Sequence, residues 1–155
     1  MLSDIRFDER DETFQDLGED MVEEFPQTNT GHDRFLGIVL LSEETGVAEF
    51  GLDWRDDLMA QQFSQVPASA PILSLMEGAC SRAVSSALSN SEPSVILSLR
   101  VDHLRPARPG HRLVGKAECV RITSRIAFAR GIAHDGDEND PVANVNASFF
   151  RVVEA

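Results

Sequence analysis

Glu77 is the residue whose type and surroundings best suit acid–base chemistry. It is the one ionisable residue in the first three turns of a long apolar segment, and Ser74, Ser81 and Ser85 share its three- or four-residue spacing. That spacing predicts a polar stripe on an otherwise apolar helix. A carboxylate is costly to bury unless it is paired or hydrogen-bonded, and desolvation makes it a stronger base. The alternative is a wetted glutamate at the helix rim, or one paired with an arginine such as Arg82.

The start of the same helix offers hydrogen-bond donors. The backbone N–H groups of Ser69 and Ala70 have no intrahelical acceptor and can stabilise a developing oxyanion. Ala70 and Glu77 are seven residues apart in the sequence, which is roughly 10 Å along a helix axis. A reacting carbonyl must lie about 3 Å from its donors and close to its base. We therefore expect an obligate homodimer, in which antiparallel helices bring Glu77 of one chain toward the helix start of the other.

The surrounding pattern predicts the elements that position this helix. Apolar residues at i, i+3 and i+4 spacing run from Pro71 to about Leu88, and the helix is apolar nearly all round, so we expect it to be buried. Before it, two runs with alternating residues flank a turn at Gly46 and predict a hairpin. The alternating residues are Phe35, Gly37, Val39 and Leu41 in the first run and Ala48, Phe50, Leu52 and Trp54 in the second. After it come four β-like runs, Val95–Leu104, Arg112–Thr123, Ile126–His134 and Val142–Val153.

Together these runs predict an α+β architecture, a long buried helix wrapped by an antiparallel sheet of about six strands. The spacing of Phe14, Leu17, Met21 and Phe25 predicts an extra N-terminal helix over about residues 11–25. We therefore divide the chain into an acidic helical extension, residues 1–30, and one folded domain, residues 31–155.

Composition limits the possible partners. The chain has 155 residues and a formal net charge of −12, which argues against nucleic acid as a partner. It has no apolar run of the ~20 residues needed to cross a bilayer and no signal-peptide pattern, so we expect a soluble cytoplasmic protein without membrane association. Its two cysteines form no CxxC pair, and we expect neither a metal nor another cofactor. A basic window over residues 97–130, which includes Arg105 and Arg108, could hold a phosphorylated ligand.

Three segments carry a resemblance to a known family. Residues 68–77, ASAPILSLME, are similar to a His-Gly-Gly-(six apolar or small)-Asp/Glu motif. Residues 101–110, VDHLRPARPG, resemble a block that contains Leu-Arg-Pro-Ala and a turn glycine. Residues 143–150, ANVNASFF, resemble a closing Ala-x-Ala-x-Ala-x-Phe strand. These motifs are typical of hot-dog fold acyl-CoA thioesterases, in particular the phenylacetate-pathway type. The resemblance covers residues 35–153 and implies the hot-dog fold, an acyl-CoA substrate and a homodimer or tetramer.

The resemblance also implies roles for individual residues. Glu77 matches the catalytic carboxylate, which would act as general base or as nucleophile. Ser69 matches the residue whose backbone N–H polarises the thioester carbonyl, and Ala70 is next to it. Gln62 matches an Asn or Gln that orients water or substrate, and Ser81 a Ser or Thr that assists. Arg105 and Arg108 are the expected contacts of the coenzyme A nucleotide.

The sequence departs from the motif at its start, where Ala68, Ser69 and Ala70 replace His-Gly-Gly. A Cβ at the glycine positions crowds the approach to the thioester. A non-catalytic hot-dog protein that binds acyl-CoA or an acyl lipid is therefore the alternative function. A dehydratase of the same fold is less favoured, because residues 56–90 contain no histidine to pair with Glu77.

Overall fold

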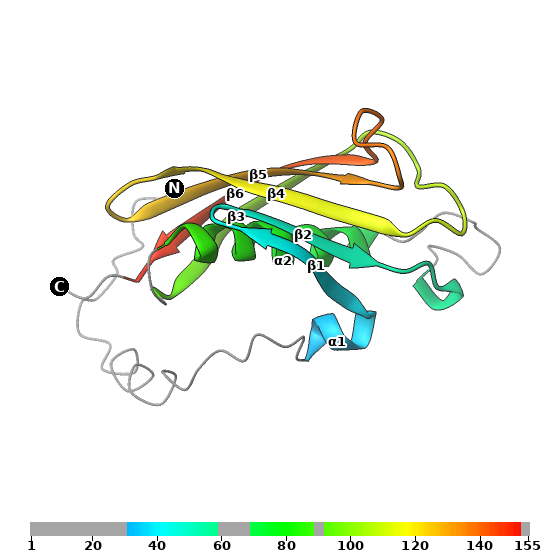
Figure 1. The fold of residues 1–155 in the computed structure, drawn as a ribbon, viewed down its shortest axis with the longest axis horizontal. Helices are drawn as coiled ribbons and strands as arrows, with labels where there is room; N and C mark the ends of the chain where they lie inside the picture. The colour runs from blue at the N-terminus through cyan, green and yellow to red at the C-terminus, as the bar shows by residue number, and fades with distance from the viewer. Residues whose placement is uncertain (1–30, 59–68, 89–91, 153–155) are drawn as a thin grey trace, which may run out of the picture.

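The computed structural model describes residues 31–58, 69–88 and 92–152. The chain begins there with a single-turn helix and a hairpin, continues through one long helix, and ends in four strands (Figure 1). The elements are α1 His32–Leu36, β1 Ile38–Glu44, β2 Val47–Leu52, a 3-10 turn Asp56–Leu58, α2 Ser69–Ala87, β3 Ser94–His103, β4 Leu113–Ile122, β5 Ile126–His134 and β6 Ala143–Arg151.

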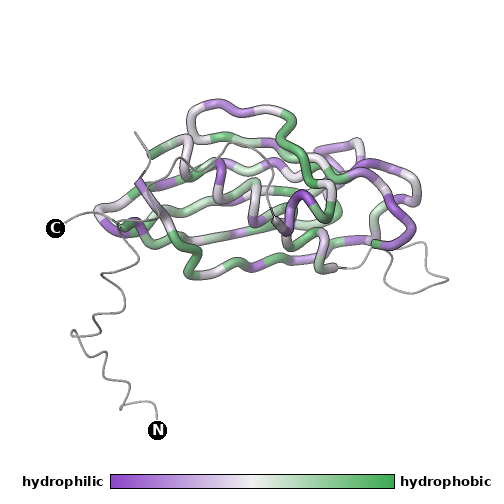
Figure 2. The backbone as a smooth tube through the Cα atoms, turned by 90° about the horizontal axis from the view of Figure 1, so that it is seen from below, coloured by the Kyte–Doolittle hydropathy of each residue, from purple (hydrophilic) through white to green (hydrophobic). Residues whose placement is uncertain are grey.

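All six strands form one antiparallel sheet with the order β1-β2-β4-β5-β6-β3. The strands β1 and β3 form its edges, and α2 packs along one face, mainly against β2, β4 and β5 (Figure 1). The predicted hot-dog α+β fold is confirmed. Seen from below in Figure 2, the strands are rich in hydrophobic residues, whereas the connections at one end of the sheet are strongly hydrophilic.

Two glycines allow α2 to lie unusually close to the sheet. A Cβ atom on Gly115 would lie 2.9 Å from both the Cγ of Leu75 and the Sδ of Met76. A Cβ atom on Gly131 would lie 2.5 Å from the carbonyl oxygen of Lys116 and 2.9 Å from the Cε of Met76. A side chain at Gly115 would therefore force Leu75 and Met76 of α2 to move, and one at Gly131 would clash first with the backbone of β4 and then with Met76.

The helix is buried on one side only, which corrects the expectation that it is buried nearly all round. The side facing the sheet is fully enclosed, with Leu75, Met76, Ala79 and Val84 at 0% exposure. On the opposite side Leu73 is 38% exposed. The physical reason is that a single sheet covers one face of a helix and leaves the other to solvent or to another molecule.

The start of the predicted hairpin also differs from the expectation. Phe35 lies in α1 rather than in a strand, and Gly37 ends that turn with a φ of 79°, the left-handed conformation that glycine adopts readily. The strand then begins at Ile38, which is buried, whereas Val39 and Leu41 are exposed. The second strand follows the prediction at Ala48, Phe50 and Leu52, which are buried, but β2 ends at Leu52, so Trp54 lies beyond the strand and is half-buried.

The extra N-terminal helix was predicted at about residues 11–25, which lie outside the described residues. The N-terminal helix that the structure describes is α1, at His32–Leu36. No described helix is long and apolar enough to span a membrane.

Candidate functional site on the open face of α2

Glu77 lies in the middle of α2, on the face that the sheet leaves uncovered. Its side chain is exposed in the single chain, with the half-buried Ser74 and Ser81 one turn away on either side. It forms no ion pair with another residue of the described ranges. The alternative partner, Arg82, is instead bound to Glu43 of β1 through an Nε–Oε2 contact of 2.7 Å. The carboxylate of Glu77 is therefore open to a molecule that approaches this face.

The two predicted N–H donors stand at the start of the same helix. Ser69 and Ala70 are the first two residues of α2 and both are exposed. Since the first turn of a helix has no intrahelical acceptors for its N–H groups, these donors are available to a ligand. Gln62, the fourth predicted catalytic residue, lies outside the described residues.

A pocket of about 370 Å³ joins the start of α2 to the connection after β3. Its lining comes from two parts of the chain that are far apart in sequence. The residues are Ser69 and Ile72 on α2 and His103, Leu104, Arg105, Pro106 and Ala107 beyond them. The structure thus brings the predicted donor Ser69 and the predicted substrate contact Arg105 to one cavity.

Arg105 is held by a buried carboxylate. Its Nη1 and Nη2 donate to the two carboxylate oxygens of Asp135 at 2.9 and 2.7 Å, and the Asp135 side chain is 0% exposed. The backbone N–H of Arg108 donates to the same carboxylate at 2.7 Å, and the Arg108 side chain reaches Asp140. Hydrogen bonds from Arg105 hold the pKa of Asp135 well below its ordinary value, against the opposing effect of burial.

The two predicted coenzyme A contacts therefore differ in availability. The Arg105 side chain is 22% exposed and its guanidinium is engaged with Asp135 and Asp140. The Arg108 side chain is 49% exposed and shares Asp140. Of the two, Arg108 has the more exposed side chain.

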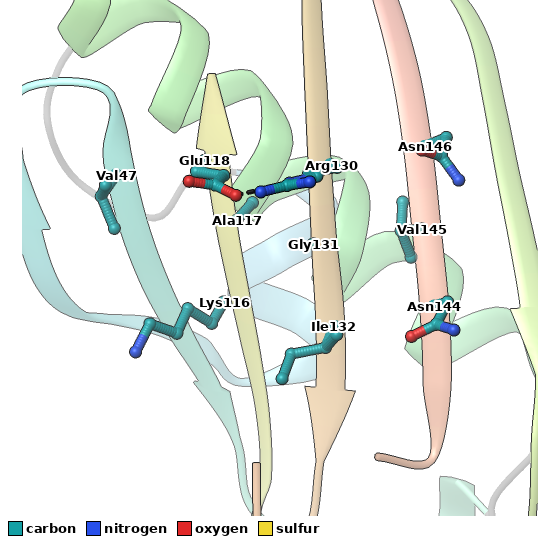
Figure 3. Close-up of a pocket in the computed structure, with 10 residues that line it drawn as sticks. All are labelled: Val47, Lys116, Ala117, Glu118, Arg130, Gly131, Ile132, Asn144, Val145 and Asn146. Carbon is teal, nitrogen blue, oxygen red and sulfur yellow. Dashed lines mark hydrogen bonds and ion pairs between the residues drawn. The ribbon is translucent and has the colours of Figure 1, made fainter. Parts of the chain in front are cut away.

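A second pocket, of about 460 Å³, lies on strands β4, β5 and β6 (Figure 3). Its charged side chains are paired with acids or bases of the same surface: Arg130 points toward Glu118 at 2.5 Å, and Lys116 lies 2.9 Å from Glu138 and 3.2 Å from Glu49. It contains no residue of α2. The pocket offers little unbalanced charge, and the open face of α2 remains the better candidate site.

The described residues contain no cluster of three or more His, Cys, Asp or Glu side chains suited to holding a metal ion. The side chains that converge on the open face of α2 are instead a carboxylate, two hydroxyls and, from α1, the imidazole of His32, whose Nε2 lies 2.8 Å from the Oγ of Ser74. Nothing in the local sequence indicated His32, because 42 residues separate it from Ser74.

Comparisons with known proteins show which proteins this chain is similar to. Residues 70–142 match the model of the Thioesterase superfamily. A protein from Pseudomonas aeruginosa is 29% identical, with a TM-score of 0.71, over 78% of this chain and 90% of that one. A mutant of the phenylacetic acid degradation protein PaaI from Thermus thermophilus is 25% identical, with a TM-score of 0.67, over 77% of this chain and 96% of that one.

A thioesterase from Haemophilus influenzae shares the fold at 22% identity, with a TM-score of 0.67, over 76% of this chain and 79% of that one. A comparison of the sequence with curated proteins finds no significant match. The resemblance to hot-dog thioesterases of the superfamily is confirmed, and it supports thioester hydrolysis as the general class of activity.

Proposed function

We propose that this protein hydrolyses acyl-CoA thioesters to a carboxylic acid and free coenzyme A, with Glu77 as the catalytic carboxylate. The observation that carries the proposal is the position of Glu77, on the uncovered face of α2 and within the segment that matches the Thioesterase superfamily. A carboxylate with no partner among the described residues is free to accept a proton from water.

The proposed reaction begins with the attack of water on the thioester and ends with cleavage of its C–S bond. Glu77 takes a proton from water as the water oxygen bonds to the thioester carbonyl carbon. The negative charge that develops on the carbonyl oxygen is stabilised by the N–H groups of Ser69 and Ala70. The C–S bond then breaks, the electron pair stays on sulfur, and the coenzyme A thiolate takes up a proton. Ser81, and Gln62 outside the described residues, are proposed to assist by orienting water or substrate.

A second copy of the chain is proposed to complete the site. The roughly 10 Å of helix between Ala70 and Glu77 is too long for one carbonyl to contact both. An antiparallel pair of α2 helices would bring Glu77 of one copy to the donors of the other. Two features support this arrangement: the apolar Leu73 on the open face, and the sheet edge β3, where Val95 and Leu97 are 56% and 57% exposed. A tetramer would be two such dimers.

The coenzyme A phosphates are proposed to bind at the pocket beside the start of α2. Arg108 is the main candidate contact, because half of its side chain is exposed. Arg105 lines the pocket itself, but its charge is balanced by the carboxylate of Asp135. Both residues lie in the connection after β3, next to the N–H donors that would polarise the thioester.

The test is a thiol-release assay over short, long and aromatic acyl-CoAs. We expect Glu77→Gln to lower kcat by at least about 100-fold, the usual effect of removing a catalytic acid or base. The matched control is Glu118→Gln, which removes an exposed glutamate of β4 and should leave kcat unchanged. Turnover that persists in Glu77→Gln would exclude Glu77 as the catalytic carboxylate.

One observation favours the alternative, a non-catalytic protein that binds acyl-CoA or an acyl lipid. Ser69 and Ala70 carry Cβ atoms at the helix start, where a thioester would approach its donors. Equilibrium binding of a non-hydrolysable acyl-CoA analogue, together with no thiol release from any acyl-CoA of the panel, would select this alternative.

A further inference from the structure

A histidine from outside α2 lies against the open face of that helix. The Nε2 of His32, the first residue of α1, is 2.8 Å from the Oγ of Ser74, and the same hydroxyl donates to the carbonyl oxygen of Ala70 at 3.2 Å. Ser74 and Glu77 are three residues apart, so their side chains share one face of the helix. The imidazole therefore lies about one helical turn from the proposed catalytic carboxylate.

The position of His32 is held by the rest of α1. Leu36, at the end of this turn, is buried, and the N–H of Gly37 donates a hydrogen bond to the carbonyl oxygen of Arg34. From outside, the Nη1 of Arg55 donates to the carbonyl oxygens of Phe35 and Leu36, both at 2.9 Å. These contacts fix the backbone of the turn that carries His32, and the hydrogen bond to Ser74 places its imidazole.

The hydrogen bonds also indicate which ring nitrogen is available. A serine hydroxyl has one proton, and the Oγ of Ser74 has a backbone acceptor for it in the carbonyl oxygen of Ala70 at 3.2 Å, so we assign the proton to that contact. The Oγ of Ser74 then accepts a hydrogen bond from the Nε2–H of His32, which leaves Nδ1 unprotonated in the neutral ring. A histidine in this state can take up a proton at Nδ1 and later give it away.

The proposed dimer places this imidazole near both sites. If Glu77 of one copy meets Ala70 of the other across a two-fold axis, the helices cross at the midpoint of these residues, between Leu73 and Ser74. His32 contacts the helix at that crossing. It is therefore close to its own helix start as well as to its own Glu77.

We propose that His32 is the general acid of the thioester hydrolysis, acting on the sulfur of coenzyme A. As the C–S bond breaks and its electron pair moves to sulfur, the imidazolium gives its proton to that sulfur and becomes neutral imidazole. Glu77, protonated by the attacking water, loses its proton to solvent, and the imidazole regains one from solvent, so each turnover ends where it began. This role rests on the proposed function and supplies the histidine that residues 56–90 lack.

Histidine changes charge between about pH 5 and 8, so the pH profile of kcat reports on this role. Several other charged groups on α1 and on the elements packed against it influence that profile. They are Asp33 and Arg34 on α1 itself, Arg55 and Asp57 after β2, Glu43 and Glu44 at the far end of β1, and Glu77 and Arg82 on α2. Burial raises the pKa of Asp33, and the charge of His32 opposes that rise.

The experiment compares His32→Ala and His32→Gln with the wild type, with Arg34→Ala, an exposed residue of the same helix, as the matched control. Each variant is assayed on an acyl-CoA and on the thiophenyl ester of the same acid. We expect both His32 variants to lower kcat on acyl-CoA by roughly 100-fold, with little change in KM. Glutamine can keep the hydrogen bond to Ser74 but cannot supply a titrating proton, so it should not rescue the rate.

The thiophenyl ester separates chemistry from folding. Its leaving group is a weak base and departs without a proton, so the His32 variants should hydrolyse it at rates near the wild type. The limb of the kcat profile that requires a protonated group should disappear on acyl-CoA in these variants and persist in Arg34→Ala. Wild-type rates in His32→Gln on acyl-CoA, or an equal loss of rate on both substrates, would overturn the role of His32 and leave the proposed function standing. An inactive wild type would instead overturn the proposed function, and the role of His32 with it.

Discussion

Arg105 and Asp135 form a bidentate ion pair that joins two of the loops connecting strands of the sheet. The contacts of 2.9 and 2.7 Å link residues thirty positions apart, one after β3 and the other after β5. Both connections lie at the same end of the sheet, which is the hydrophilic end in Figure 2. The wall of the pocket beside the start of α2 is therefore held in shape by a carboxylate that has no access to solvent.

Removing this carboxylate should destabilise the fold. We expect Asp135→Ala to lower the free energy of unfolding by about 3 kcal/mol, because it leaves the N–H of Arg108 and much of the Arg105 guanidinium without their acceptor. Urea denaturation measures the change. The matched control is Asp102→Ala, which removes the exposed partner of Arg100 and should cost less than about 1 kcal/mol. Equal losses in the two variants would contradict a structural role for the Asp135 pair.

The same pair should make stability depend on acid pH. The pKa of Asp135 is lowered in the folded state, so the folded protein holds the ionised form more strongly than the unfolded chain does. Its contribution to the free energy of unfolding is therefore complete above the unfolded pKa, about 3.9, and is lost as the pH falls below it toward the folded pKa. The measurement is the difference between the wild type and Asp135→Asn in urea denaturation from pH 7 to 2.5. That difference should be constant above about pH 5 and should shrink at lower pH.

The open face of α2 should control assembly. We expect Leu73→Asp to shift the protein toward monomers in sedimentation velocity and to lower thioesterase activity in parallel, because a charge at the proposed helix crossing cannot be buried without a partner. Val120→Asp changes another exposed apolar residue, on β4, and should leave the dimer intact. A dimer that survives Leu73→Asp with full activity would place the interface elsewhere.

The two cysteines should differ in reactivity. Burial raises the pKa of the Cys80 thiol to about 12, and Cys80 is fully buried on the sheet-facing side of α2. Since the thiolate is the reactive form, we expect native protein at pH 8 to be modified by iodoacetamide at Cys119 well before Cys80. Mass spectrometry of the labelled peptides gives both rates. Labelling of Cys80 at the rate found in urea would show that the core opens readily.

The core of the fold follows from local patterns. The i, i+3, i+4 spacing of Leu75, Met76 and Ala79 identified the buried side of α2, and alternation identified the inward residues of β2. The alternation of Phe35, Val39 and Leu41 was misleading. Phe35 lies in a helical turn that the left-handed Gly37 ends, and in the strand that follows Ile38 is buried whereas Val39 and Leu41 are exposed.

The site could be predicted only in part. Helical spacing predicted the position of Glu77 on a polar stripe. Its exposure depends on whether a second layer covers the helix, and the residue pattern of the helix does not indicate this. The hydrogen bond between His32 and Ser74 and the ion pair between Arg105 and Asp135 join residues 42 and 30 positions apart. Such pairs depend on tertiary packing, and nothing in the spacing of either residue indicates its partner.

The glycines at positions 115 and 131 have a consequence for substrate specificity. Because the Met76 side chain fills the space where their Cβ atoms would stand, the helix and sheet leave no room between them at this level for a fatty or aromatic tail. The tail of the proposed thioester substrate would then extend over the outer surface of the helix, where the proposed second subunit would form the opposite wall. Chain-length preference would in that case be set by the fit between subunits, and substitutions at their contact would change which acids are released.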